Sequence, residues 1–149
     1  MFTLSRKTKV GRVESVDFPD LGIHQIHAKI DTGAYGSAID CKDIKVAEKE
    51  DKEVLKFTLL DPESDFFTGK KVIAKNFKTV RIKNSFGQIQ RRYVIKTPIV
   101  LDGKKFSVEL SLVDRGSMKY PVLLGRKALK NRFIVDVDHS FLVSKEERN

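Results

Sequence analysis

The chain carries Lys-Ile-Asp-Thr-Gly-Ala at residues 29–34, directly after a stretch in which apolar and polar residues alternate. That alternation, from Ile26 to Ile30, predicts a half-buried β-strand. Asp31 follows at the end of the strand, and Gly33 permits a tight turn that brings a backbone N–H close to the carboxylate. Taken alone, the tripeptide Asp-Thr-Gly is more often an Asx turn after a strand. Its meaning therefore depends on the rest of the chain.

The same two-residue period recurs along the chain and predicts an all-β protein. Asp102-Gly103 suits a two-residue type I′ hairpin loop, since both positions of that loop need a positive φ. Short strands separated by regular turns favour a sandwich or a barrel. No repeat or linker divides residues 1–149, so a single domain is expected. Further strands are predicted at 54–60, 89–95, 99–101, 106–112 and 133–135, and turns at 19–22 and 84–87.

Two segments depart from the strand pattern. Good helix formers after Gly125 predict one short helix from Arg126 to about Arg132, with the glycine as its cap. The segment Asp43–Glu53 is dense in charge, and it is predicted to be a solvated loop or a frayed helical turn.

The composition limits the class of protein. The 149 residues include 29 Lys and Arg against 20 Asp and Glu, a net charge of +9, which indicates an acidic partner without naming it. The apolar runs are too short to span a membrane, and the first residues lack the apolar stretch of a signal peptide. The single cysteine, Cys41, excludes an internal disulfide. We therefore expect a cytoplasmic protein.

A second motif changes the interpretation of the first. Residues 121–129 read Pro-Val-Leu-Leu-Gly-Arg-Lys-Ala-Leu, which places two apolar residues, Gly125 and Arg126 before the predicted helix. Together the two motifs resemble those of the retropepsin-like aspartic peptidases, over roughly residues 23–143. The resemblance implies a closed β-barrel of the retropepsin, or acid protease, type with one short C-terminal helix. It also implies that the strand at 122–124 crosses beneath the Asp31 loop.

The resemblance implies roles for individual residues. Asp31 would be the catalytic carboxylate, braced by Thr32 and Gly33, and Ala34 would line the substrate site. Retroviral relatives carry an acid where Tyr35 stands, so we expect the arginine of the second motif to pair with another carboxylate or to bond backbone carbonyls. The residues expected to support the loop are Ser37, Leu124, Gly125 and Arg126.

A hairpin from Arg81 to Arg92 occupies the place of the flap in such peptidases. Its tip, with Phe86 and Gly87, would cover a bound peptide as a mobile element. This tip has fewer glycines than the retroviral flaps do.

The chemistry of this class needs two carboxylates that share one proton. One acts as a general base on the attacking water, and the other donates a hydrogen bond to the scissile carbonyl. The chain has one Asp-Thr-Gly. The second carboxylate is therefore expected from a second subunit, with Asp31 beside its own copy on a two-fold axis. This interpretation predicts a homodimeric endopeptidase.

A narrower resemblance adds a partner. Val-Gly-Arg-Val-Glu at 10–14, the motif at 29–34 and Ser37-Ala38 are similar to a small bacterial family labelled ATP-dependent zinc proteases. Some of its members are associated with an ATP-grasp ligase that adds glutamates to a ribosomal protein, which implies such a ligase as a partner. The chain has no P-loop and no zinc-protease motif, so we expect neither a cofactor nor a metal. His24, His27, Cys41 and His139 show no ligand spacing.

Two other interpretations remain open. Basic residues gather around the expected flap, with Phe77, Phe86 and Tyr93 between them, so the chain could be a non-catalytic module that binds RNA or ribosomal protein. A solvated face is favoured over RNA binding. Basic residues around the cleft would also attract an acidic peptide substrate. The basic residues are Lys70, Lys71, Lys75, Lys78, Arg81, Lys83, Arg91, Arg92 and Lys96, with Lys127, Lys130 and Arg132 on the helix.

Cys41 is expected to be a buried apolar residue rather than a nucleophile.

Overall fold

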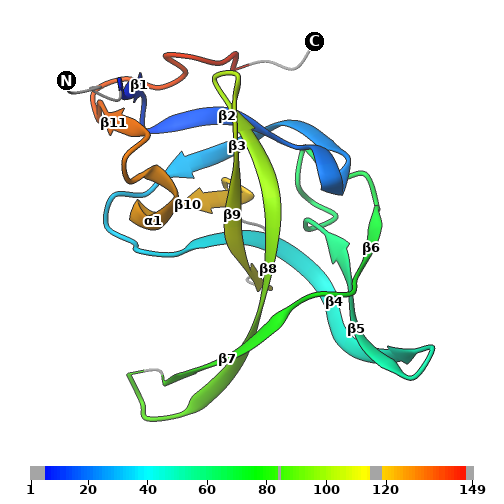
Figure 1. Ribbon diagram of the computed structural model, residues 1–149. Coiled ribbons are helices and arrows are strands. Elements are labelled where there is room, and N and C mark those ends of the chain that lie inside the picture. The colour runs from blue at the N-terminus through cyan, green and yellow to red at the C-terminus, as the bar shows by residue number, and fades with distance from the viewer. Residues whose placement is uncertain (1–5, 84, 115–118, 147–149) are drawn as a thin grey trace, which may run out of the picture.

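The computed structural model describes residues 6–83, 85–114 and 119–146, and its main elements are β-strands (Figure 1). Within these residues there is one short α-helix, α1 (Arg126–Leu129), and one 3₁₀ turn, η1 (Pro19–Leu21). The strands are β1 (Thr8–Val10), β2 (Val13–Phe18), β3 (Ile23–Ile30), β4 (Ser37–Lys49), β5 (Lys52–Leu59), β6 (Lys71–Ala74), β7 (Lys78–Lys83), β8 (Ile89–Leu101), β9 (Lys104–Val113), β10 (Val122–Leu124) and β11 (Phe133–Val135).

Six of the strands close into a barrel. The neighbours in the sheet run β10, β3, β2, β8, β9 and β4, and β10 then pairs with β4 to complete the circle. The strand β10 is parallel to β3 and antiparallel to β4. The predicted all-β class and the closed barrel with one short helix are confirmed.

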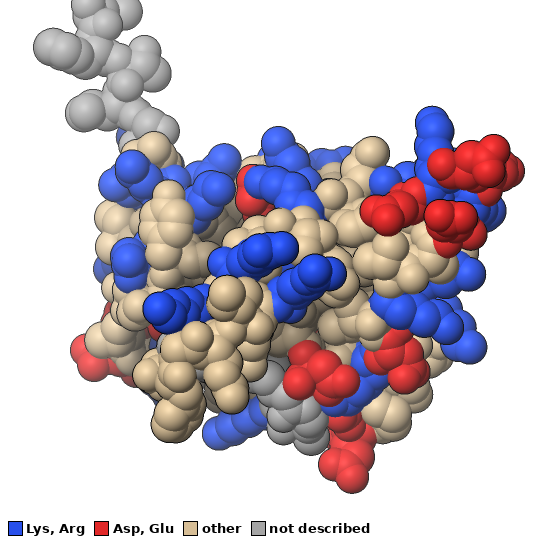
Figure 2. All heavy atoms as spheres, turned by 90° about the horizontal axis from the view of Figure 1, so that it is seen from below, with Lys and Arg blue, Asp and Glu red and all other residues tan. Residues whose placement is uncertain are grey.

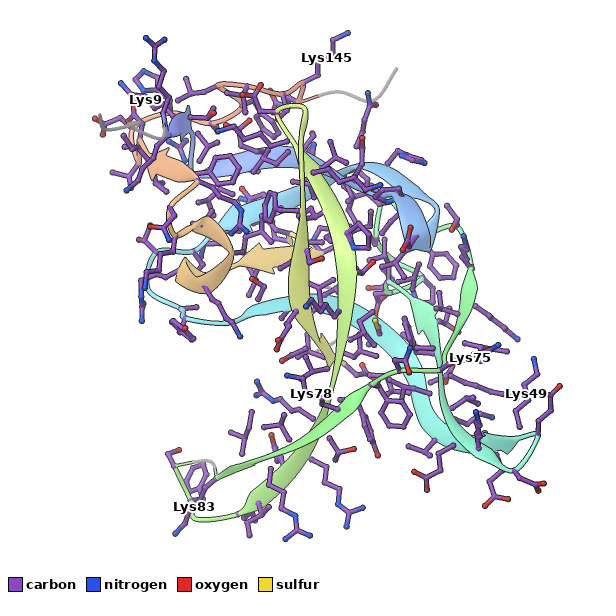
Figure 3. All side chains as sticks on the ribbon, viewed as in Figure 1. Lys9, Lys49, Lys75, Lys78, Lys83 and Lys145 are labelled. Carbon is purple, nitrogen blue, oxygen red and sulfur yellow. The ribbon has the colours of Figure 1, made fainter. Side chains whose placement is uncertain are left out.

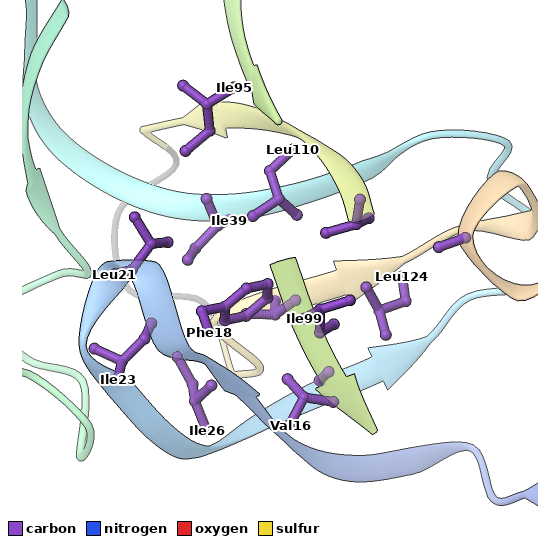
Figure 4. Close-up of a cluster of buried hydrophobic side chains, with 14 of the residues drawn as sticks. Val16, Phe18, Leu21, Ile23, Ile26, Ile39, Ile95, Ile99, Leu110 and Leu124 are labelled. Carbon is purple, nitrogen blue, oxygen red and sulfur yellow. The ribbon is translucent and has the colours of Figure 1, made fainter. Parts of the chain in front are cut away.

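The barrel interior is filled by apolar side chains from all of its walls (Figure 4). Phe18 from β2, Ile99 from β8 and Leu124 from β10 are all completely buried. Each of these strands places alternate residues inward, so one face of every strand contributes to the same core. Burial of apolar area on this scale is the main favourable term in folding, at about 25 cal/mol for each Å². The site is therefore built on the wall of a packed barrel.

The segment Asp43–Glu53 is not the loop or helical turn that the charge pattern predicted. It forms the ends of β4 and β5, which continue as a hairpin beyond the barrel (Figure 1). Glu50 and Asp51 form the turn, with φ of 53° and 63°. Solvent surrounds much of this hairpin, so charged residues are tolerated there while cross-strand pairing keeps the backbone extended.

Two further boundaries differ from the sequence prediction. The predicted strands 89–95 and 99–101 are one strand, β8, which continues through Pro98. Pro98 pairs with β9 on one side, and the described pairings of β8 with β7 end before it, so the missing N–H is tolerated there. The helix α1 ends at Leu129 rather than near Arg132, because the backbone of Lys130 leaves the helical region with a ψ of 133°.

Local turn signals were more reliable. Asp102 and Gly103 both have positive φ, at 53° and 70°, and they join β8 to β9 as predicted. The turn at 19–22 is η1 followed by Gly22 with φ of 66°. The strand at 133–135 is confirmed as β11. Asn84, in the predicted turn 84–87, lies outside the described residues.

The hairpin predicted as a flap is present and projects from the barrel (Figure 1). We call β7 and the part of β8 up to Val94 the flap hairpin, since Lys78 pairs with Val94 and Lys83 pairs with Ile89. Figure 3 labels Lys78 near the base of the hairpin and Lys83 near its end. Most side chains of β7 are exposed.

The residues 136–146, the C-terminal strap, are held against β2 around one buried carboxylate. Glu14 is completely buried. Backbone hydrogen bonds from the N–H of Arg12 to His139 and from the N–H of Phe141 to Val13 hold the strap in register. The donors to the Glu14 carboxylate are the N–H groups of Gly11 at 2.7 Å, Leu142 at 2.9 Å and Val143 at 3.2 Å, and the hydroxyl of Ser144 at 2.6 Å.

In the described part of the chain, no helix is long and apolar enough to cross a membrane.

Candidate active site

Asp31 lies at the end of β3, where the chain leaves the barrel wall. Its side chain is partly exposed. The backbone N–H of Gly33 donates a hydrogen bond of 3.0 Å to its Oδ1, as the Asp-Thr-Gly sequence predicts. Its own N–H donates to the carbonyl of Leu124 at 2.8 Å. The carboxylate is therefore oriented by its own loop, while the backbone of Asp31 is fixed by β10. We call residues 31–36 the Asp31 loop.

The second sequence motif passes along the Asp31 loop and binds it at successive points. The N–H of Arg126 donates to the carbonyl of Ala34 at 2.8 Å, and the N–H of Lys127 donates to the carbonyl of Tyr35 at 3.0 Å. Just beyond the loop, the N–H of Gly125 donates to the hydroxyl of Ser37 at 3.0 Å, and this contact is buried. Because the two bonds to the loop itself join backbone groups, they fix the path of the loop regardless of its exposed side chains.

Gly125 is required by the close approach of the loop. A Cβ atom at this position would lie 2.2 Å from the carbonyl oxygen of Gly36 and 2.6 Å from that of Tyr35. Both neighbours are backbone atoms, which cannot rotate away as a flexible side chain can. The glycine of the second motif therefore allows the start of α1 to contact the Asp31 loop.

Arg126 bonds a backbone carbonyl, one of the two alternatives that the sequence left open. Its guanidinium donates to the carbonyl of Thr32 at 3.1 Å. The guanidinium also lies over the ring of Tyr35, 5.9 Å from its centroid, within the range of a cation–π contact. The aromatic residue thus contacts the arginine through its ring. Thr32 itself is exposed, and in this contact it contributes its carbonyl oxygen.

A groove of about 460 Å³ runs beside the Asp31 loop, between the loop, β8, β9 and α1. Its lining includes Tyr35 and Gly36 from the loop. The charged residues of the lining are Lys96 on β8, Glu109 on β9, Lys127 on α1 and Arg132 just after it. We call this the loop-side groove. It is positively charged overall, because three cations face one carboxylate.

Glu109 was not singled out by the sequence, although its partners Lys78 and Lys127 were among the basic residues noted there. The ammonium of Lys78 lies 3.1 Å from one oxygen of Glu109, and that of Lys127 lies 3.6 Å from the other. These contacts lower the pKa of Glu109 below its ordinary value. The hydrogen bond from Lys78 contributes most to this shift, and the charge of Lys127 contributes less. The alternation at 106–112 places Glu109 on the polar face of a strand, which the sequence could have shown. Its ion-pair partners come from distant segments, which the sequence could not show.

The structure does not bring the expected flap tip to this groove. Phe86 and Gly87 are not part of the groove lining. Phe86 is 88% exposed, and Gly87 has a φ of 80° in the turn between β7 and β8. Ala34 is partly exposed in the loop. The contact of the tip with a bound peptide stays a prediction.

The histidines and the cysteine lie in separate environments. His24 faces Asp17, His139 faces Asp136, and His27 contacts the carbonyl of Glu146. Cys41 is completely buried, and burial raises the pKa of its thiol well above the ordinary value. In the part of the chain that the structure describes, no three His, Cys, Asp or Glu residues form a group that could hold a metal ion.

The barrel, the Asp31 loop and the strand beneath it define a retropepsin-like protein. A family model described as "RimB-like: Retropepsin-like aspartic endopeptidase RimB" matches residues 9–146. The chain belongs to this RimB-like family, which is the resemblance that its two motifs indicated.

Curated relatives carry a different name. The chain is 35% identical to a probable alpha-L-glutamate ligase of Shewanella halifaxensis (strain HAW-EB4) over 92% of its length. It is also 35% identical to a protein of the same name from Desulfotalea psychrophila (strain LSv54 / DSM 12343), over 87% of its length. The chain spans only 30% and 28% of the length of these two relatives.

A solved structure supports the fold. The crystal structure of Lpg0085, a protein of unknown function from Legionella pneumophila subsp. pneumophila str. Philadelphia 1, matches with a TM-score of 0.71 at 27% sequence identity. The match covers 93% of this chain and 99% of that one.

Proposed function

We propose that the chain is an aspartic endopeptidase that acts as a homodimer, with Asp31 from each subunit forming the catalytic pair. The observation that carries the proposal is the placement of Asp31 at the rim of the barrel. Its carboxylate is partly exposed and is held at 3.0 Å by the N–H of Gly33. Membership in the family of retropepsin-like endopeptidases supports the same chemistry.

The proposed mechanism uses the two carboxylates in different protonation states. Two carboxylates in close contact hold one proton between them, because two like charges at that distance repel. The ionised partner removes a proton from a water molecule that attacks the scissile carbonyl. The protonated partner donates a hydrogen bond to the carbonyl oxygen as negative charge develops there. Thr32 and Gly33 brace the pair, while β10 holds each loop from below.

The proposed class of substrate is inferred from the positive charge of the loop-side groove. Lys96, Lys127 and Arg132 line the loop-side groove next to the Asp31 loop. Figure 2 shows a face of the molecule on which Lys and Arg side chains are spread from left to right among uncharged residues, while most Asp and Glu side chains lie toward the right. This charge favours a peptide or protein substrate with acidic side chains near the cleaved bond. Ala34, Phe86 and Gly87 would contact its backbone.

The first test is the molecular mass in solution from pH 5 to 8, for the native chain and for Asp31→Asn. We expect a dimer, and we expect Asp31→Asn to tighten it because two facing carboxylates no longer repel. Asp20→Asn, an exposed change on η1, is the matched control and should behave like the native chain. Cleavage of a peptide library should be lost in Asp31→Asn and kept in Asp20→Asn.

Two results would contradict the proposal. A strict monomer at high concentration at every pH would remove the shared pair of carboxylates. Cleavage that survives in Asp31→Asn would show that another group performs the chemistry.

The names of the curated relatives favour a second candidate function, that of a partner of a glutamate ligase. The chain is similar to about 30% of the length of proteins named probable alpha-L-glutamate ligase. Similarity to part of proteins that carry the ligase name supports an association of this domain with such a ligase. The test is coelution of this chain with a separate alpha-L-glutamate ligase on gel filtration. Complex formation that is equal for the native chain and Asp31→Asn would assign the partner role independently of peptide cleavage.

A further inference from the structure

The loop-side groove contains one carboxylate of its own among the described lining residues. Glu109 lies directly opposite Lys96 in the register of β8 and β9, so the two side chains share one face of the sheet. It also contacts Lys78 and Lys127. Three lysines from three different elements therefore surround a single glutamate.

These contacts join parts of the site that are far apart in sequence. Lys78 is the first residue of β7, at the base of the flap hairpin. Lys127 follows Arg126 in α1, and its N–H bonds the carbonyl of Tyr35 in the Asp31 loop. Glu109 thus connects the flap base to the element that supports the loop.

We propose that Glu109 is an internal substitute for an acidic substrate side chain, occupying the cations of the loop-side groove until a substrate carboxylate replaces it. The inference rests on the proposed function, because it assumes that a peptide lies along this groove. It identifies Glu109 as a specificity-determining residue: its charge sets how strongly the groove binds an acidic peptide and keeps the flap base tied to α1.

The exposure of the pair partners makes this exchange feasible. The side chain of Glu109 is 30% exposed, and those of Lys78 and Lys127 are 64% and 54% exposed. Ion pairs this accessible are weak and are screened by salt. An incoming carboxylate can therefore take over either lysine without breaking a buried interaction. Water and salt compete for the same contacts, so the effect on affinity is moderate.

The test measures peptide binding in the Asp31→Asn background, so that no peptide is cleaved. Two fluorescein-labelled peptides are compared, one rich in glutamate and one with each glutamate replaced by glutamine. We expect Glu109→Gln to bind the glutamate peptide about 3- to 10-fold more tightly, with a steeper dependence on salt. The glutamine peptide should bind as before. Glu48→Gln, an exposed change in the β4–β5 hairpin, is the matched control and should bind both peptides unchanged.

A second variant tests whether Lys127 is the cation for which Glu109 and the substrate carboxylate compete. In a chain that already carries Lys127→Gln, the change Glu109→Gln should alter affinity for the glutamate peptide less than it does alone, because one released cation is missing. Equal effects in the two backgrounds would mean that Glu109 does not act through Lys127 and would overturn this coupling.

The inference is wrong if Glu109→Gln leaves affinity for the glutamate peptide unchanged, weakens it, or strengthens both peptides equally. It is also wrong if neither peptide binds any variant. In that case cleavage by the native chain separates the two proposals. A native chain that cleaves neutral peptides keeps the endopeptidase function and loses only the role of Glu109. A monomeric chain that cleaves nothing loses both.

Discussion

The hydroxyl of Ser37 accepts a buried hydrogen bond of 3.0 Å from the backbone N–H of Gly125, across 88 residues of sequence. Ser37 is the first residue of β4, and Gly125 is the residue before α1. This contact joins the residue just after the Asp31 loop to the centre of the second motif. The Asp31 loop therefore keeps its path only while β10 and α1 remain in place beneath it.

Replacement of Gly125 by alanine should displace the Asp31 loop. The added Cβ would lie 2.2 Å from the carbonyl oxygen of Gly36. Overpacking of this kind costs about 1–3 kcal/mol, and each kcal/mol lowers the melting temperature by about 2–4 °C in a protein of this size. Gly36→Ala is the control, since a Cβ there meets nothing within 4 Å. Equal melting temperatures for the two variants would contradict the prediction.

Ser37→Ala should leave the N–H of Gly125 without its partner. A buried donor that loses its acceptor costs about 1–3 kcal/mol. We expect a lower melting temperature and faster hydrogen exchange at the Gly125 amide, measured by NMR. Ser107→Ala, at an exposed position on β9, should change neither quantity. An unchanged exchange rate at Gly125 would show that the hydroxyl does not protect this amide.

Glu14→Gln should loosen the C-terminal strap. The native carboxylate accepts hydrogen bonds from three backbone N–H groups and one hydroxyl, whereas an amide presents N–H donors to some of these donors. The loss of even one buried bond to a charged acceptor costs about 1.5–3 kcal/mol. Faster hydrogen exchange at Leu142 and Val143 would show the effect. Glu48→Gln, at an exposed position, serves as the control, and protection that persists in Glu14→Gln would refute the role of the carboxylate.

Stability should fall in acid partly through Asp61. A hydrogen bond from the backbone N–H of Glu63, and a smaller contribution from Lys42, lower the pKa of the Asp61 carboxyl below its ordinary value. This carboxylate therefore stabilises the fold above about pH 4, and its contribution disappears as the pH falls through its lowered pKa. The difference in melting temperature between the native chain and Asp61→Asn should be largest above pH 5 and shrink toward pH 3. A constant difference would contradict the prediction.

Features set by local geometry were predictable from the sequence. The turn at Asp102-Gly103 follows from the positive φ that both residues tolerate. The meeting of the Asp31 loop with the strand at 122–124 was implied by the family resemblance, and the hydrogen bond from Asp31 to Leu124 is its structural form.

Features set by pairing between distant segments were not predictable. The charged segment Asp43–Glu53 becomes a hairpin because its two halves pair with each other, which outweighs their polar composition. The partners of Glu109 lie on β7 and α1, so no spacing in the sequence predicts them. The burial of Glu14 depends on a strap more than 120 residues later in the chain.

The strand β8 behaves mechanically as a beam fixed at one end. From Tyr93 onward it pairs with β9, while residues 89–92 pair only with β7 in the described ladder. An isolated two-stranded ribbon is only marginally stable. The flap hairpin is therefore expected to bend between its tip and Tyr93, because no pairing with β9 has to break in that part of β8. Ile99, on the same strand, is expected to stay packed in the core while the hairpin bends.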